Sequence, residues 1–174
     1  KKKRIIQGDQ KIKKITDKLV TLAALAGDIN NDGYTDLFIT TFSPRDSIHI
    51  FGTQILLKNN GNGTFNDISL KSNIANDTFL GAASCFGDIN NDGLADVFFT
   101  ANQGSNKLYL NKGGFQFKDI SDEAGFNNKK QFSTGVVMAD INNDGWLDIF
   151  VCNAGNMEDS SLRRNQLFIN DHNL

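Results

Sequence analysis

Residues 87–100 read GDINNDGLADVFFT, and near-copies of this stretch occur twice more in the chain. The earlier copy, at residues 27–40, reads GDINNDGYTDLFIT, and the later one, at residues 139–152, reads ADINNDGWLDIFVC. The first aspartates of the three copies lie 60 and 52 residues apart. A segment repeated at such intervals indicates a repeat architecture, in which each copy belongs to one structural unit.

Each acidic copy is followed by the signals of short β-strands. An apolar run that ends in asparagine occurs at residues 56–59, 108–111 and 167–170. The first two runs continue through glycine-rich turns into FNDIS (65–69) and FKDIS (117–121), a pattern typical of β-hairpins. We therefore predict four strands in each unit. In the second unit they are residues 82–86, 95–100, 107–111 and 117–121.

Four antiparallel strands that recur every ~50–60 residues predict an all-β fold made of β-propeller blades. Residues 13–16 match the fourth-strand pattern, although residues 15–26 are also the best candidate for a helix. Because a closed propeller needs at least four blades, we expect a segment of a larger propeller, whose remaining blades are its partners. The predicted units are the end of a preceding blade (1–17), two blades (18–70 and 71–122) and an incomplete blade (123–174).

The acidic copies also have the spacing of a metal-binding loop. Side-chain oxygens occur at positions 1, 3, 5 and 9, with glycine at position 6, so that one tight turn can direct several oxygens at a hard cation. We expect position 7 to add its backbone carbonyl. The predicted ligands are Asp28, Asn30, Asp32, Tyr34 and Asp36; Asp88, Asn90, Asp92, Leu94 and Asp96; and Asp140, Asn142, Asp144, Trp146 and Asp148.

The donor chemistry predicts calcium, at about one ion per loop and three in all. All the donors are oxygens, which disfavours zinc and copper, and magnesium is disfavoured because it gives up its water ligands reluctantly. An EF-hand would need a glutamate at position 12, where this chain has Ile39, Phe99 and Val151. Metal-free acidic turns are the other alternative, but all three copies share every ligand position.

The motif D-x-N-x-D-G-x-x-D between strands resembles the FG-GAP (VCBS) repeats of integrin α-subunit propellers. Residues 108–126, LYLNKGGFQFKDISDEAGF, resemble the family related to cartilage acidic protein. The resemblance implies a calcium-stabilised extracellular propeller, usually seven-bladed, that acts in adhesion or ligand binding. By matching positions, it also implies the same fifteen residues as calcium ligands.

Composition and charge narrow the class of protein. The chain has 174 residues and a formal net charge of −2, which favours neither nucleic acid nor direct membrane insertion. We expect any signal peptide of an exported protein to lie outside these residues. Open oxygen loops bind calcium at about 10⁻⁴–10⁻³ M, which fits an extracellular, cell-surface or periplasmic location. We expect Cys85 and Cys152 to be buried free thiols; a disulfide between them is the alternative, which their spacing does not support.

The connections between the second and third strands are long in two units, around residues 43–53 and 154–165. In an up-and-down blade they lie on the face opposite the acidic loops, so we expect this face to bind a protein or glycan ligand. We predict a non-catalytic binding or adhesion module. Two alternatives stay open: the propeller domain of a secreted lyase, hydrolase or quinone-type oxidoreductase, and a structural spacer in a surface assembly. The chain's histidines are His49 and His172, and neither HExxH nor GxSxG occurs.

Overall fold

The computed structural model describes residues 20–42, 54–74, 80–126, 131–154 and 163–173. The predicted end of a preceding blade (1–17) lies outside the described residues, as do most of the two long connections and His49. The elements are β1 (Val20–Gly27), β2 (Asp36–Phe42), β3 (Ile55–Asn59), β4 (Phe65–Asp67), the 3₁₀ helix η1 (Ser69–Lys71), β5 (Leu80–Gly87), β6 (Asp96–Gly104), β7 (Lys107–Asn111), β8 (Phe117–Asp119), β9 (Gln131–Ala139), β10 (Asp148–Asn153) and β11 (Gln166–Phe168).

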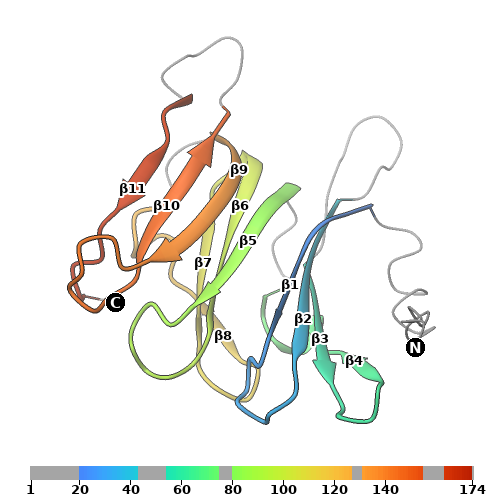
Figure 1. Ribbon diagram of the computed structural model, residues 1–174. Coiled ribbons are helices and arrows are strands. Elements are labelled where there is room, and N and C mark those ends of the chain that lie inside the picture. The colour runs from blue at the N-terminus through green and yellow to red at the C-terminus, as the bar shows by residue number, and fades with distance from the viewer. Residues whose placement is uncertain (1–19, 43–53, 75–79, 127–130, 155–162, 174) are drawn as a thin grey trace, which may run out of the picture.

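The strands form antiparallel sheets in which sequential strands are neighbours. The first blade has the order β1-β2-β3-β4, and β5, β6, β7 and β8 pair in the same way to form the second. In the third blade, β10 lies between β9 and β11. The first strands β1, β5 and β9 lie side by side, as Figure 1 shows. This is the arrangement of a β-propeller segment, as predicted.

The second and third blades also touch through their strands. Asn102 of β6 pairs with Phe132 of β9, and Gly104 pairs with Gln131. The hydrogen-bonded strands of both blades therefore form one seven-stranded sheet. This contact involves the ends of β6 and β9 that lie away from the acidic loops. The two blades therefore meet along their first strands and at this edge.

Two apolar clusters fill the spaces between neighbouring blades. In the first core cluster, Phe38 of β2 lies 5.9 Å from Phe99 of β6, whose ring stacks on Tyr109 at 5.6 Å between centroids. In the second core cluster, Phe126 lies 5.0 Å from Phe98 and 4.6 Å from Phe168. Aromatic rings give large buried area and specific contacts, so these clusters hold the blades against each other.

The observed strands differ in detail from the predicted ones. The fourth strand of the second blade ends at Asp119 rather than residue 121, because the Ser121 N–H donates to the Asp119 carboxylate and turns the chain. Residues 20–26 of the helix candidate form β1 instead and pair antiparallel with β2. The described helix is η1, and no helix among the described residues has the length and apolar character to span a bilayer.

Candidate metal centre

The predicted ligand positions run through the turns that join the first and second strands of each blade, with position 9 at the start of the second strand. We call residues 28–36, 88–96 and 140–148 the first, second and third loops. Gly33 at position 6 of the first loop has a φ of +85°, a conformation that side chains rarely adopt. The glycines at position 6 of the other loops have φ values of +84° and +89°. Glycine is therefore needed at this position, as the motif predicts.

Position 1 organises each loop by accepting two backbone hydrogen bonds. In the first loop Asp28 Oδ1 accepts the Asp32 N–H at 3.0 Å, and Asp28 Oδ2 accepts the Gly33 N–H at 2.8 Å. Asp88 makes the same two contacts at 3.0 and 2.8 Å, and Asp140 makes them at 3.1 and 2.9 Å. The three turns therefore share one scaffold, in which the first carboxylate closes the loop.

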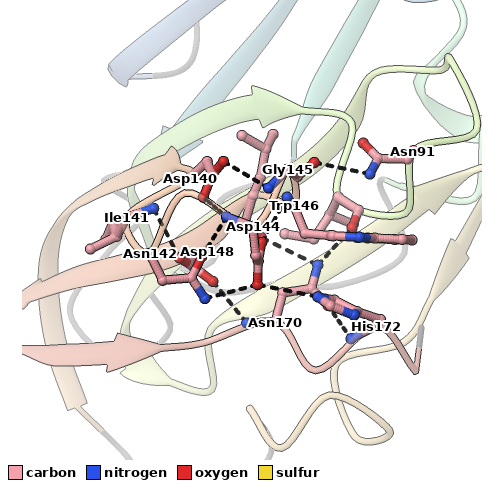
Figure 2. A network of polar contacts seen from close by, with 12 residues as sticks. Asn91, Asp140, Ile141, Asn142, Asp144, Gly145, Trp146, Asp148, Asn170 and His172 are labelled. Atoms are coloured by element: carbon pink, nitrogen blue, oxygen red, sulfur yellow. Dashed lines mark hydrogen bonds and ion pairs between the residues drawn. The ribbon is translucent and has the colours of Figure 1, made fainter.

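Positions 3 and 5 face each other across the loop. Asn30 Nδ2 donates to Asp32 Oδ2 at 2.9 Å, and the corresponding amides of the second and third loops do the same. Position 7 takes part through its N–H: Tyr34 N donates to Asp32 Oδ1 at 3.0 Å, with equivalents in both other loops. These contacts, led by the Asn30 side chain, lower the pKa of Asp32, so this carboxylate stays ionised. Figure 2 shows the same network in the third loop.

The position 9 aspartates have a different environment from the other candidate ligands. Asp36, Asp96 and Asp148 are fully buried. Asp96 Oδ2 accepts the Ile89 N–H at 2.9 Å, and Asp96 Oδ1 accepts the Asn111 N–H at 2.8 Å. Burial raises the pKa of Asp96 to about 6 and also raises the pKa of Asp36. Position 9 thus fastens each loop to the end of its third strand, and its role as a calcium ligand stays a prediction.

One oxygen in the first loop has no partner. Asn30 Oδ1 is buried and accepts no hydrogen bond, whereas Asn90 Oδ1 and Asn142 Oδ1 accept the N–H of position 5. A buried acceptor of this kind is costly unless a donor or a cation satisfies it. With the carboxylates of Asp28 and Asp32 in the same turn, the donor set is made of hard oxygens and fits calcium.

Carboxylates alone do not make the site. Within the described ranges, no three Asp, Glu, His or Cys side chains lie together as a metal-binding cluster. The predicted set depends equally on asparagine and backbone oxygens, which such a cluster does not include. If a divalent cation is bound, it supplies positive charge that offsets carboxylate repulsion, while Asp28, Asn30 and Asp32 hold it and the backbone N–H groups orient them.

A family model for FG-GAP-like repeats matches residues 28–99 and 88–151. The chain belongs to the FG-GAP-like repeat family. Each match begins at the first aspartate of one loop and extends into the strand that follows the next loop. Each match therefore contains two acidic turns, and in the structure each of these turns joins the first and second strands of a blade.

Relatives of this FG-GAP chain include cartilage acidic protein 1 from three vertebrates. The protein from Mus musculus is 29% identical over 124 residues, which cover 70% of this chain and 19% of that protein. The Homo sapiens protein is also 29% identical over 124 residues, covering 70% and 18%. The Xenopus tropicalis protein is 38% identical over 69 residues, covering 40% and 11%. The chain thus matches less than a fifth of the length of these relatives.

Sequence reasoning missed the asparagines that join neighbouring FG-GAP loops. At position 4, Asn31 Nδ2 donates to the Gly93 carbonyl of the next loop at 3.0 Å, and Asn91 Nδ2 donates to the Gly145 carbonyl at 3.1 Å. At the end of the third strand, Asn111 Nδ2 donates back to the Ile29 carbonyl at 2.8 Å. Asn170 makes the equivalent bond to the second loop. Asparagine recurs at both positions in every repeat, and this recurrence could have indicated a structural role.

Sequence reasoning also missed two side chains that contact position 5. Lys58 Nζ lies 3.3 Å from Asp32 Oδ2 in the first loop. His172 Nε2 lies 3.2 Å from Asp144 Oδ2 in the third loop, and the His172 ring stacks on Trp146 at 4.8 Å, as Figure 2 shows. The loops therefore share a scaffold but differ in what surrounds it. Cys85 and Cys152 are free thiols, as predicted, but both are half-buried rather than buried.

Proposed function

We propose that this chain is a calcium-binding, non-catalytic propeller module of an extracellular or cell-surface protein. The observation that carries the proposal is the shared loop scaffold, in which backbone N–H groups hold the first carboxylate in the same way three times. The unpartnered Asn30 Oδ1 beside Asp28 and Asp32 supports a cation in the first loop. Calcium is the ion that best fits oxygens alone at this spacing.

The expected role of the ion is to stabilise the blade tips. Each loop holds three aspartates within nine residues, and the position 9 carboxylate is fully buried. A divalent cation bound to the folded loop adds about 1.4 kcal/mol per site when its concentration is ten times the dissociation constant. Three loops occupied together would therefore stabilise the folded chain by several such increments.

Calcium titration of the intact chain tests this proposal. Isothermal titration calorimetry should give about three sites with dissociation constants in the ~10⁻⁴–10⁻³ M range, and the melting temperature should rise with calcium. Asp28→Asn, Asp88→Asn and Asp140→Asn should each remove one site. Asp122→Asn is the matched control, since Asp122 is exposed and lies outside the loops. No binding heat and no melting shift at millimolar calcium would refute the proposal.

We also propose that a protein or glycan ligand binds the face opposite the loops. The support is topological: β2 ends at Phe42 and β10 ends at Asn153, away from the acidic turns, so both long connections leave from that face. Trimming residues 43–53 or 155–162 should abolish ligand binding in a screen of extracellular proteins and glycans without changing calcium binding. Binding that survives both deletions would refute this assignment.

We also propose that the protein is extracellular or on the cell surface and that the module has no catalytic activity. The expected calcium affinity fits the millimolar calcium found outside cells. Fractionation of cells that express the whole protein should therefore find it in the medium or at the surface, and cytosolic protein would argue against this location. A screen with lyase, hydrolase and quinone-oxidoreductase substrates should show no turnover. A module that binds no ligand but is required for assembly would favour the spacer role instead.

A further inference from the structure

The first loop differs from the other two in carrying a lysine at its edge. Lys58 Nζ contacts Asp32 Oδ2 at 3.3 Å, the same oxygen to which Asn30 Nδ2 donates. The unpartnered Asn30 Oδ1 belongs to that same side chain. The ammonium group therefore contacts one of the carboxylates that we assign to the cation of this loop.

Neighbouring structure holds Lys58 in this place. Its backbone belongs to β3, one residue before Asn59, whose N–H donates to Asp36 Oδ1 at 2.8 Å. Its ammonium group also lies 5.2 Å from the ring centroid of Phe115, which comes from the second blade and is buried. The ammonium group thus has two partners, the Asp32 carboxylate and the Phe115 ring.

The corresponding positions in the other blades are uncharged. Leu110 precedes Asn111 in the second blade, and Ile169 precedes Asn170 in the third. Leu110 is buried in the second core cluster, whereas Ile169 is 51% exposed. In the third loop, His172 reaches Asp144 from a different position, two residues after Asn170. Within the described residues, a lysine at the loop edge is specific to the first loop.

We propose that Lys58 is a built-in counter-ion of the first loop that competes with the divalent cation and lowers the affinity of this loop. The inference rests on the proposed calcium function. Without calcium, the ammonium group offsets part of the repulsion between Asp28, Asp32 and Asp36. With calcium, the same charge opposes the ion at short range, so the three loops fill at different calcium concentrations.

Terbium luminescence can resolve the first and third loops separately. An aromatic ring close to bound terbium transfers energy to it, and position 7 is Tyr34 in the first loop and Trp146 in the third. In a Trp146→Phe background, tyrosine-sensitised emission reports the first loop, and loss of this emission in Tyr34→Phe confirms its source. With Trp146 present, tryptophan-selective excitation reports the third loop. Displacement of terbium by calcium then gives the calcium affinity of each loop.

Lys58→Met should tighten calcium binding to the first loop by about fivefold. Lys118→Met is the matched control, because it removes the same charge from an exposed pair with Glu123 and should leave the affinity unchanged. Ile169→Lys is the converse variant: it places a lysine at the exposed equivalent position and should weaken the third loop. An unchanged or weaker first loop in Lys58→Met would overturn the inference.

Thermal unfolding adds a second readout that a merely structural lysine would not give. Lys58→Met should lower the melting temperature in EDTA more than in saturating calcium, because the carboxylate repulsion that Lys58 offsets is uncompensated only when calcium is absent. The lost contact with Phe115 is common to both conditions and gives no such difference. Equal shifts in both conditions would also overturn the inference. If neither Tyr34 nor Trp146 sensitises terbium and calcium gives no binding heat, the proposed calcium function itself fails. If the third loop responds and Lys58→Met changes nothing, only the role of Lys58 fails.

Discussion

The third strands of the three blades carry a leucine at the same place, and its surroundings differ. Leu56 and Leu108 are fully buried, whereas Leu167 is 47% exposed. All three lie three residues before the asparagine that follows the apolar run, and they lie in strands paired in the same way. Burial at this position therefore comes from what packs on the strand and not from the strand itself.

The covering residues explain the difference. Leu56 packs in the first core cluster with Ile74 and with Phe115 and Phe117 of the next blade. Leu108 packs in the second core cluster with Ile120 and Phe126, but it also lines a groove of about 380 Å³ between the second and third blades. Among the described residues, the third blade has no segment equivalent to β4 or β8. In the first two blades this leucine is thus covered by residues that follow the third strand and by aromatic side chains, which the third blade lacks at Leu167 among the described residues.

Alanine at the three leucines should give a graded series and the largest effects. Leu56→Ala should cost about 4–5 kcal/mol, since it leaves a cavity in a closed core, and Leu108→Ala about 2–3 kcal/mol, since its site already borders a groove. Leu167→Ala should cost less than about 1 kcal/mol because the side chain is half exposed. Urea unfolding of the three variants measures the series. Equal costs for Leu56 and Leu167 would show that the leucines are equivalent in solution.

The reactivity of Cys85 tests how tightly the second and third blades pack against each other. Burial against the second core cluster raises the pKa of Cys85 to about 12, so its reactive thiolate is scarce at mildly alkaline pH and increases as the pH approaches 12. In a Cys152→Ser background, alkylation by iodoacetamide should be at least about thirtyfold slower in the folded chain than in the urea-unfolded chain. Similar rates in both would indicate that the interface beside the groove opens readily.

Removal of the Asn111 side chain should weaken the contact between the first and second blades. Asn111→Ala deletes the buried bonds to the Ile29 and Ala95 carbonyls and should cost about 2 kcal/mol in urea unfolding. Asn59→Ala is the matched control, because Asn59 Nδ2 donates to the exposed Thr35 carbonyl of its own blade. It should cost less than about 1 kcal/mol. A control as destabilising as Asn111→Ala would argue against a special role for the bond between blades.

The exposed link between the loops should have the smallest effect. Asn31→Gly tolerates the positive φ of 58° and loses the bond to the Gly93 carbonyl, while glycine also adds freedom to the unfolded chain, so it should cost about 0.5–1 kcal/mol. Asn31→Ala should cost about 1 kcal/mol more, because alanine is strained in that conformation. Thermal unfolding of the two variants separates the contribution of the hydrogen bond from the cost of backbone strain. If the two variants are equally stable, conformational strain does not explain the asparagine.

Much of the fold could be predicted because the same strand and turn signals recur in each repeat. The apolar runs that end in Asn59 and Asn111, with the glycine-rich turns after them, placed β3, β7 and the hairpins to β4 and β8, whereas the third run passes the end of β11 at Phe168 and continues to Asn170. The short helix η1 and the early end of β8 could not be predicted. Both depend on side chains that bond to the backbone locally: Ser69 N and Ser121 N donate to Asp67 and Asp119.

The loops could be predicted as turns with clustered oxygens, but their connections could not. Spacing gave Asp96 the same weight as Asp88, whereas the structure buries Asp96 and binds both of its oxygens to backbone N–H groups. The partners of Asn31 and Asn111 lie 62 and 82 residues away. Contacts at such separation depend on how blades pack, which a spacing rule within one loop does not contain.

The hydrogen bond from the position 4 asparagine of one loop to the position 6 glycine of the next, which we call the joint, also bears on how such a protein can change its length during evolution. Each loop carries both a donor at position 4 and an acceptor at position 6, so any unit can follow any other with the same two partners. Duplication or loss of a whole unit by recombination therefore leaves every joint intact, as in repeat proteins that are stabilised by nearest-neighbour contacts. A gain or loss of half a unit would separate a donor from its acceptor, so blades are expected to be inherited whole.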